Sequence, residues 1–308
     1  MRIVVMGAGG LGSKFGGLLA EHADVWLVHR RPAHVEAIER HGLRIRRDGA
    51  ERIVSPRATT DLRGLGTVDV VLLLVKSYDT DGAAEAIVPL LGRHSLVVTF
   101  QNGLGNLETL AGRAGAARSA LGVTFQGATL AGPGTVIDTG HGPSYLGGAP
   151  ASADRVSALA ELLTRATIPT EVVANVEGLL WAKLAVTAGI NAVAAVLRVP
   201  NGVLGRVAEA KQLSLRAIDE TMAVAEARAI RLAFDPRERF ELVTAATADM
   251  RSGTLLDAMR GRRTEVDALS GAIAAAGRAA GVPTPVNEAL WLMVKAIEAT
   301  HTFRVAEA

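Results

Sequence analysis

The stretch Arg2-Ile3-Val4-Val5-Met6-Gly7-Ala8-Gly9-Gly10-Leu11-Gly12 decides the fold of the chain. Apolar, mostly β-branched residues lead into Gly7-x-Gly9-x-x-Gly12, and a helix-compatible segment over residues 13–21 comes next. Strand, glycine turn and helix in this order form the dinucleotide-binding fingerprint. The first glycine permits the tight turn, the second admits a pyrophosphate, and the third lets helix and strand pack closely. We therefore expect a nucleotide site, against the alternative of a structural turn, at Gly7, Ala8, Gly9, Gly10, Leu11 and Gly12.

Composition limits the class of protein. A chain of 308 residues exceeds the usual size of a single core, so two domains are expected. The hydrophobic fraction of 49% and the charged fraction of 21% are those of a soluble globular protein. A net charge of +2 without long runs of Lys or Arg argues against a nucleic-acid partner. The absence of cysteine excludes disulfides and thiolate metal ligands, so we expect a cytoplasmic protein without a metal site. We expect no membrane span, because polar residues interrupt the longest later apolar stretch, residues 184–199.

The end of the second predicted strand, Asp24–Val28, indicates which dinucleotide is bound. This strand runs into His29-Arg30-Arg31-Pro32, and the next carboxylate in the sequence is Glu36. NAD enzymes usually place Asp or Glu at this strand end to hold the ribose 2′-hydroxyl, whereas arginine accommodates a 2′-phosphate. The sequence therefore favours NADP(H), with Arg30 as the main determinant. The alternative is that both arginines are solvated loop charges.

Two further strands are expected to end at the same crevice. The runs Val68–Val75 and Ser95–Phe100 read as buried strands, and they deliver Lys76 and Asn102 at their carboxyl ends. Ligands of open α/β sheets bind beyond these ends. A lone loop lysine or an Asn-Gly turn is more often structural, but their shared placement favours function. Residues 42–54 predict a hairpin, and residues 119–148 predict antiparallel strands that extend the sheet.

A change in composition divides the chain. Of the 33 glycines, 24 lie in residues 1–150 and 9 in the remainder, which is rich in Ala, Leu, Val and Arg at helical spacing. We predict an α/β fold with an N-terminal Rossmann-type domain, residues 1–174, and a C-terminal all-helical domain, residues 175–308. Helices are expected over residues 177–199, 207–230, 236–251, 264–280 and 286–299, with a turn at residues 200–202.

The first of these helices carries a polar stripe. Lys183, Thr187 and Asn191 are spaced four apart in an otherwise apolar segment, so they share one face, and Gly189 predicts a break near the middle. A buried polar group without a partner costs about 1–3 kcal/mol, which a ligand would offset. Alternatively, Lys183 snorkels to the surface and the other two residues bond to neighbouring helices. The pattern leaves these alternatives equal.

These residues together resemble the ketopantoate reductases (2-dehydropantoate 2-reductases) over essentially the whole chain. The resemblance rests on Gly7-x-Gly9-x-x-Gly12, Arg30, Val75-Lys76-Ser77, Gln101-Asn102-Gly103-Leu104-Gly105, Trp181-x-Lys183-Leu184, Asn191, Pro200-Asn201-Gly202 and Arg263-Thr264-Glu265-Val266-Asp267. It implies a Rossmann domain and a helical substrate domain with NADPH between them.

The resemblance also implies roles for individual residues. Lys183 matches the general acid and Glu265 the carboxylate that hydrogen-bonds the substrate. Lys76 and Asn102 match positions at the cofactor and substrate edge. Asn191 and Asn201 match amides of the substrate pocket.

Two positions of the substrate pocket depart from the family pattern. Thr187 stands where the family usually has Asn, one helical turn after the general acid. Gly253, between Ser252 and Thr254, stands where it usually has a Ser that contacts the substrate carboxylate. We therefore include Thr187, Ser252 and Gly253 among the substrate-binding positions and expect these departures to affect the choice of substrate rather than the reaction class.

The resemblance implies an NADPH-dependent reduction of a 2-oxo acid, ketopantoate to pantoate in pantothenate biosynthesis. An alternative enzyme is another NADP-dependent hydroxyacid or imine dehydrogenase with the same two domains. A non-catalytic alternative is an NADPH sensor, although a sensor needs neither Lys183 nor Glu265. The expected partner is a small-molecule 2-oxo acid, and a homodimer is left open.

Overall fold

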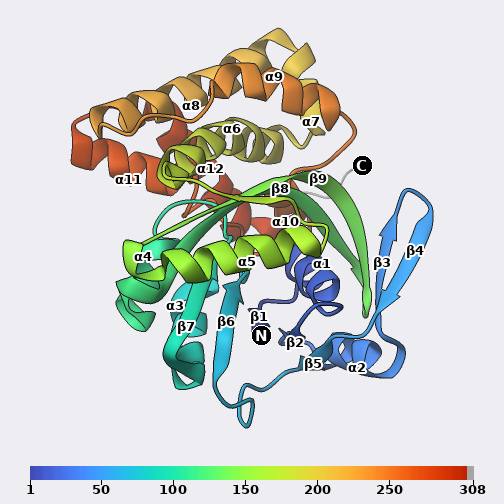
Figure 1. Ribbon diagram of the computed structural model, residues 1–308. Coiled ribbons are helices and arrows are strands. Elements are labelled where there is room, and N and C mark those ends of the chain that lie inside the picture. The colour runs from blue at the N-terminus through green and yellow to red at the C-terminus, as the bar shows by residue number, and fades with distance from the viewer. Residues whose placement is uncertain (304–308) are drawn as a thin grey trace. The chain divides into compact units, whose positions relative to one another are not determined.

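The computed structural model describes residues 1–303 and separates into two compact units (Figure 1). The N-terminal unit comprises residues 1–101 and 106–176, and the C-terminal unit comprises residues 102–105 and the described chain from residue 177. The sequence-based boundary after residue 174 lies two residues before this division. It also assigns residues 102–105 to the first domain, whereas in the structure they pack with the second unit.

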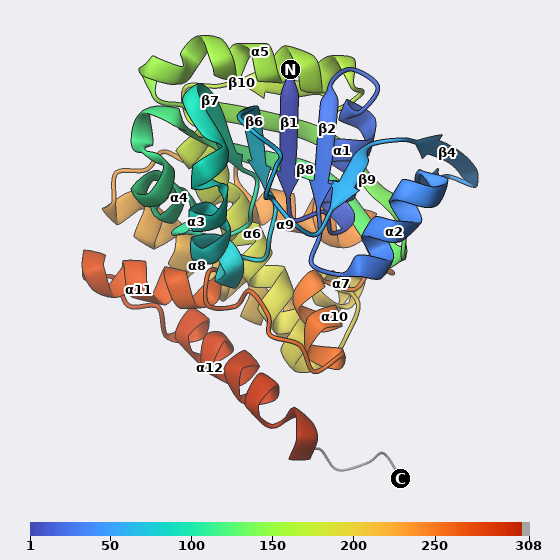
Figure 2. The same cartoon turned by 90° about the horizontal axis from the view of Figure 1, so that it is seen from below.

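A parallel sheet forms the centre of the N-terminal unit. Its strands are β1 (Arg2–Met6), β2 (Asp24–Val28), β5 (Arg57–Thr59), β6 (Val68–Leu73), β7 (Leu91–Thr99) and β8 (Ser119–Gly132). Their spatial order, β5-β2-β1-β6-β7-β8, is the 3-2-1-4-5-6 order of a Rossmann fold. β1, β2 and β6 lie side by side in Figure 2. The order reverses between β1 and β6, which is where this fold binds its ligand.

An extension with both parallel and antiparallel pairs enlarges the sheet. It consists of β3 (Leu43–Arg47), β4 (Ala50–Val54), β9 (Thr135–Gly148) and β10 (Thr170–Val172). β8 and β9 pair antiparallel, β3 and β10 pair parallel with β9, and β3 and β4 form the predicted hairpin. The antiparallel strands expected in residues 119–148 are thus the two long strands β8 and β9, and β8 also pairs in parallel with β7.

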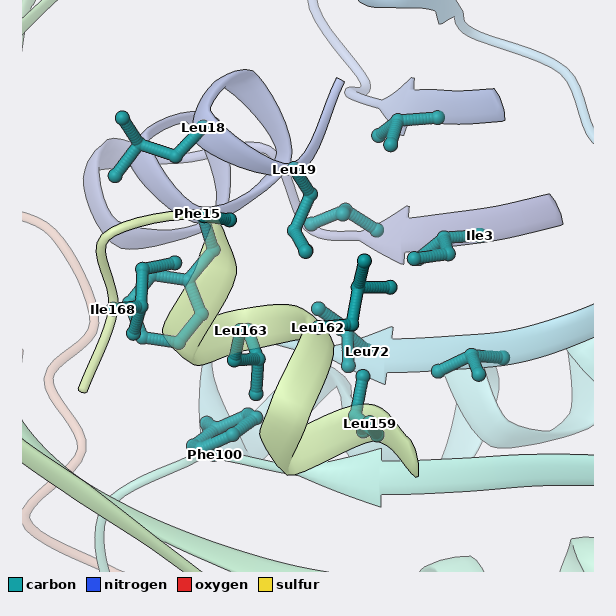
Figure 3. Close-up of a cluster of buried hydrophobic side chains, with 14 of the residues drawn as sticks. Ile3, Phe15, Leu18, Leu19, Leu72, Phe100, Leu159, Leu162, Leu163 and Ile168 are labelled. Carbon is teal, nitrogen blue, oxygen red and sulfur yellow. The ribbon is translucent and has the colours of Figure 1, made fainter. Parts of the chain in front are cut away.

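Helices cover both faces of this sheet. They are α1 (Gly10–Leu19), α2 (Pro32–His41), α3 (Thr80–Ile87), α4 (Asn106–Ala114) and α5 (Ala153–Arg165), with short 3-10 turns η1 (Ser77–Asp79), η2 (Val88–Leu90), η3 (Ala116–Arg118) and η4 (Pro150–Ser152). Side chains of α1 and α5 meet over β1 and β6 in a buried apolar cluster (Figure 3). Phe15 of α1 contacts Phe100 edge-on at a ring distance of 5.3 Å. Helix α4 was not expected from the sequence.

The C-terminal unit is helical throughout its described part. Its helices are α6 (Val176–Leu197), α7 (Asn201–Arg206), α8 (Ala208–Ala227), α9 (Pro236–Ala246), α10 (Gly253–Met259), α11 (Ser270–Ala280) and α12 (Pro285–Ala299), followed by the turn η5 (His301–Phe303). Among the helices of residues 1–303, α6 alone is long and apolar enough to cross a membrane, but 67% of its most apolar window is buried. A helix buried to this extent is typical of a protein core.

Four predictions for the helical part are wrong. The break near Gly189 is absent from α6, which is continuous from Val176 to Leu197. A Cβ on Gly189 would lie 2.8 Å from Ile218 Cγ1 and 2.9 Å from the Ser214 carbonyl oxygen, so this glycine serves close packing against α8. The turn expected at residues 200–202 is the start of α7. The helix expected over residues 236–251 ends at Ala246, five residues early. The helix expected from residue 264 starts only at Ser270.

Candidate active site

The glycine turn after β1 has the geometry that its sequence predicts. Gly7 has a φ of 103°, and a Cβ there would lie 2.5 Å from the backbone nitrogen of Val75. A Cβ on Gly12 would overlap the carbonyl oxygen of Gly7. At position 7, only glycine allows both the positive φ and the close approach of the Val75 backbone. The turn therefore lies directly against the chain that leaves β6, immediately before Lys76.

The first turn of α1 is suited to an anion. Its N-cap is Gly9, whose ideal Cβ meets nothing within 4 Å among the described residues, and its first turn contains no acidic side chain. Free N–H groups and the positive end of the helix dipole favour a phosphate at such a terminus. On the opposite side, a Cβ on Gly10 would overlap the carbonyl oxygen of Ala128. The residues present thus fit a dinucleotide pyrophosphate beside Gly9.

A buried chain of hydrogen bonds fixes the turn from behind. The Gly134 N–H donates to His34 Nδ1 at 3.0 Å, so His34 Nε2 carries the ring proton and faces Ser13 Oγ at 3.2 Å. Ser13 in turn donates to the Ala8 carbonyl oxygen at 2.8 Å. Burial, aided by the neighbouring His29, lowers the pKa of His34 to about 4. A neutral His34 therefore joins the β8–β9 turn to the nucleotide turn.

Arg30 lies at the end of β2, as predicted, but with a partner that the sequence did not reveal. Its guanidinium is exposed and lies 3.6 Å from the carboxylate of Asp79 in η1. The first carboxylate that follows β2 in the sequence is Glu36, whereas Asp79 comes from the end of β6. The proximity of these two strand ends in a Rossmann sheet is the signal that could have identified Asp79.

The ends of β6 and β7 lie at one edge of the sheet because these strands pair in parallel. Gln101, which follows β7, donates from Nε2 to the Val75 carbonyl oxygen at 2.9 Å and to Thr80 Oγ1 at 2.7 Å. The first bond fixes the backbone immediately before the half-buried Lys76, and the second holds the Thr80 side chain at the start of α3. Lys76 thus lies close to the glycine turn within the N-terminal unit.

The polar stripe of α6 is present in the C-terminal unit. Between Trp181 and Ala195 only three residues are half-buried, namely Lys183, Thr187 and Asn191. All the remaining residues of this stretch are buried. Thr187 Oγ1 donates to the Lys183 carbonyl oxygen at 2.8 Å, so its hydroxyl proton is already used within the helix. The stripe leaves the Lys183 ammonium at one end and the Asn191 amide at the other.

Lys183 interacts with two groups of its own unit. Its Nζ donates to Asn102 Oδ1 at 2.8 Å. Burial lowers the pKa of Lys183 to about 8, and the negative charge of Glu265 opposes this shift. Lys183, Asn102 and Glu265, which are far apart in the sequence, therefore form one cluster. A lysine with a pKa near neutrality can hold a proton and also release it.

The remaining predicted pocket residues lie near the far end of the stripe. Ser252, the N-cap of α10, accepts from the Leu255 N–H and contacts the Asn191 carbonyl oxygen at 3.4 Å. Asn201 donates from Nδ2 to Thr247 Oγ1 at 3.0 Å, and its buried Oδ1 has no hydrogen-bond partner in residues 1–303. Gly253 is exposed, and a Cβ there would meet nothing within 4 Å among the described residues.

Known proteins match both halves of the chain. The family model "Ketopantoate reductase PanE/ApbA" matches residues 3–151, and its C-terminal counterpart matches residues 175–298. A 2-dehydropantoate 2-reductase of Halobacterium salinarum is 36% identical over 96% of this chain and 98% of its own. The chain belongs to the ketopantoate reductase family. It is accordingly an oxidoreductase that uses a nicotinamide cofactor.

Solved structures confirm the fold. A PanE/ApbA family ketopantoate reductase from Ralstonia eutropha JMP134 is 34% identical, with a TM-score of 0.90 over 98% of this chain and all of that one. A D-mandelate dehydrogenase solved with NADH and anilino(oxo)acetate has a TM-score of 0.91 at 24% identity, covering 98% and 99% of the two chains. At this identity the second likeness concerns the fold alone.

Proposed function

We propose that this chain reduces ketopantoate to pantoate with NADPH and that Lys183 is the general acid. The observation that carries this proposal is the cluster of Lys183, Asn102 and Glu265, in which the lysine has a pKa of about 8. When bound, the nicotinamide supplies hydride to the C2 carbonyl. The carbonyl oxygen then takes a proton from Lys183, whose ammonium also stabilises the developing alkoxide. The name of the family and of the Halobacterium relative supports this assignment.

We assign the substrate contacts to the other polar groups of the C-terminal unit. Glu265 hydrogen-bonds the substrate near the reacting carbon, and Asn191 and Ser252 bind its polar groups. Asn201 supplies an acceptor, because its buried Oδ1 is unpartnered among the described residues. A buried acceptor without a partner costs about 1–3 kcal/mol, which a substrate hydroxyl such as that of ketopantoate would offset. Thr187 and Gly253 shape the pocket and contribute fewer donors than the family pattern.

We assign the cofactor to residues of the N-terminal unit. Residues 7–12 and the first turn of α1 bind the pyrophosphate, and Lys76 lies beside them. The 2′-phosphate of NADPH is recognised by Arg30, with help from Arg31. Charge-assisted hydrogen bonds of this kind are worth about 1.5–3 kcal/mol, or roughly 10- to 100-fold in affinity. We propose a cytoplasmic location, because a chain without cysteine fits a reducing compartment.

The test is NADPH oxidation with ketopantoate against a panel of 2-oxo acids, 3-hydroxy acids and imines. We expect the highest kcat/KM with ketopantoate. Lys183→Ala serves as the control for contaminating reductases, because it should bind NADPH and turn over poorly. A panel member that exceeds ketopantoate in kcat/KM would contradict the substrate assignment, and an imine as the best substrate would contradict the reaction class as well.

The open space at Gly253 favours one second candidate, a reductase of a bulkier or differently branched 2-oxo acid. The panel should therefore include 2-oxo acids that are larger at C3 than ketopantoate. Equal turnover of these compounds would indicate that the pocket has widened.

A further inference from the structure

The segment between α10 and α11 carries Glu265, and polar side chains of α12 hold it in place. Glu298 Oε1 accepts a hydrogen bond from the backbone N–H of Thr264 at 2.8 Å and another from Thr264 Oγ1 at 2.6 Å. Thr264 is buried, and only 13% of the Glu298 side chain is exposed. Glu298 therefore fixes the residue immediately before Glu265 at both its backbone and its side chain.

The same helix face also holds the residue two positions after Glu265. Asp267 accepts from Trp291 Nε1 at 2.8 Å and from Lys295 Nζ at 3.1 Å. Lys295 also donates to Glu298 Oε2 at 3.0 Å, which closes the network. Trp291, Lys295 and Glu298 recur at helical spacing and so share one face of α12. We call these three residues the α12 brace.

The braced segment supports Asn102 as well as Glu265. Thr264 Oγ1 accepts from the Val266 N–H at 3.2 Å, which fixes the backbone across Glu265. The Ala268 carbonyl oxygen accepts from the Leu104 N–H at 3.0 Å. Gly103 has a φ of 88°, and a Cβ there would overlap this same carbonyl oxygen. Residues 102–105 are therefore seated on the segment that the α12 brace holds.

We propose that Thr264 and the α12 brace are positioning residues for the Lys183 cluster. They act on both neighbours of Lys183, on Glu265 directly and on Asn102 through Ala268 and Leu104. The inference rests on the proposed roles of Lys183 and Glu265. A displacement of about 1 Å at a reacting group can cost on the order of 100-fold in rate. This effect distinguishes positioning from a role in stability alone.

The test compares Glu298→Ala with Glu298→Gln. Glu298→Ala removes the oxygen that accepts both hydrogen bonds of Thr264, so we expect kcat to fall about 10- to 100-fold with the NADPH Kd unchanged. Glu298→Gln keeps an amide oxygen for Thr264 and should recover most of the rate. The matched control is Glu288→Ala, which removes an exposed ion pair of the same helix, 3.2 Å from Arg278. This control should behave as the wild type.

A second measurement does not depend on the substrate. The titration of Lys183, followed by NMR with labelled lysine, should move to lower pH in Glu298→Ala, because a displaced Glu265 raises the pKa of Lys183 less. If wild-type kcat with every oxo acid is negligible, the proposed function fails while this titration still tests the brace. An unchanged titration in folded Glu298→Ala, or an equal change in Glu288→Ala, overturns the inference. If Glu298→Ala does not fold, Thr264→Val against Thr264→Ser provides the same comparison.

Discussion

At the residue scale, Lys183 is subject to two opposing influences. Burial lowers its pKa to about 8, whereas the charge of Glu265 raises it. A general acid must be protonated to act, so kcat should be constant below this pKa and fall tenfold per pH unit above it. A pH profile of kcat between pH 6 and 10 measures this fall, the basic limb of the profile.

Lys183→Ala should lower kcat by about 10²–10⁴ and remove the basic limb while NADPH affinity changes little. Near-wild-type turnover in Lys183→Ala would make this residue structural.

Glu265→Gln tests the electrostatic coupling within the cluster. Removal of the carboxylate takes away the charge that raises the pKa of Lys183, so the basic limb should move to lower pH. Losses should therefore be larger at pH 8 than at pH 6. An unshifted limb would indicate that the charge of Glu265 does not act on Lys183. A loss of NADPH affinity equal to the loss of kcat would indicate misfolding.

Asp79 is predicted to weaken the preference for NADPH. Its carboxylate lies 3.6 Å from Arg30, the side chains of Arg30 and Asp79 are 74% and 44% exposed, and the carboxylate competes with a 2′-phosphate for the same guanidinium. Exposed ion pairs are worth about 0.2–1 kcal/mol, so Asp79→Asn should tighten NADPH binding roughly 1.4- to 5-fold. Binding of NADH, which lacks this phosphate, serves as the control and should not change.

Arg30→Asp should reduce the preference for NADPH over NADH. A preference equal to that of the wild type in this variant would exclude Arg30 as the determinant.

At the scale of elements, the packing partners of α6 decide whether it is continuous. Its polar stripe was predictable, because a period of four needs no knowledge of other helices. Its continuity was not, since Gly189 suggests a break in isolation and a close contact in the presence of α8. The contact at Ser214 involves a backbone oxygen, which cannot move aside as the end of a flexible side chain can.

Gly189→Ala is therefore expected to destabilise the protein. A methyl group there would crowd Ile218 and the Ser214 carbonyl oxygen, and overpacking of this kind costs about 1–3 kcal/mol. Gly112→Ala provides the control, because Gly112 lies within α4 and its Cβ would meet nothing within 4 Å among the described residues. There the higher helix propensity of Ala should stabilise by up to about 1 kcal/mol. Thermal unfolding measures both, and an unchanged or raised Tm for Gly189→Ala would contradict the packing role.

The sequence specified the parallel strands β1, β2, β6 and β7 well, because buried parallel strands are continuous apolar runs and their carboxyl ends are marked by polar residues. The short strand β5 was not expected, and β8 was expected only as an antiparallel strand. The sequence failed where a distant group competes with the local preference. Residues 264–269 have helix-compatible composition, yet they form turns, and the Ala268 carbonyl oxygen, which a continuous helix would pair with an N–H four residues on, accepts from the Leu104 N–H. The grouping of Lys183 with Asn102 and Glu265 followed from the family resemblance. The pairing of Arg30 with Asp79 depends on the proximity of the ends of β2 and β6. Neither the sequence patterns nor the family resemblance described this proximity.

At the scale of the whole molecule, stability should depend on pH through His34. The pKa of this histidine is about 4 in the folded protein and about 6.5 in an unfolded chain. Between these values the unfolded state binds more protons, so the unfolding free energy should fall as the pH falls from 6.5 to 4. The loss reaches about 3 kcal/mol. Calorimetry over this range measures it. His34→Gln should flatten the dependence, whereas His41→Gln, at the exposed end of the same helix, should leave it intact.

The four residues 102–105 have an evolutionary consequence. The chain leaves the N-terminal unit after Gln101, returns at Asn106, and leaves again after Val176, so the gene does not divide into two contiguous modules. A helical domain recombined onto a different Rossmann domain at residue 177 would arrive without the Leu104 N–H that bonds to Ala268 and without the Asn102 oxygen that bonds to Lys183. Recombination between ancestral domains could therefore succeed only with partners that already carried this loop. The two halves of this enzyme are thus expected to have been inherited together rather than exchanged.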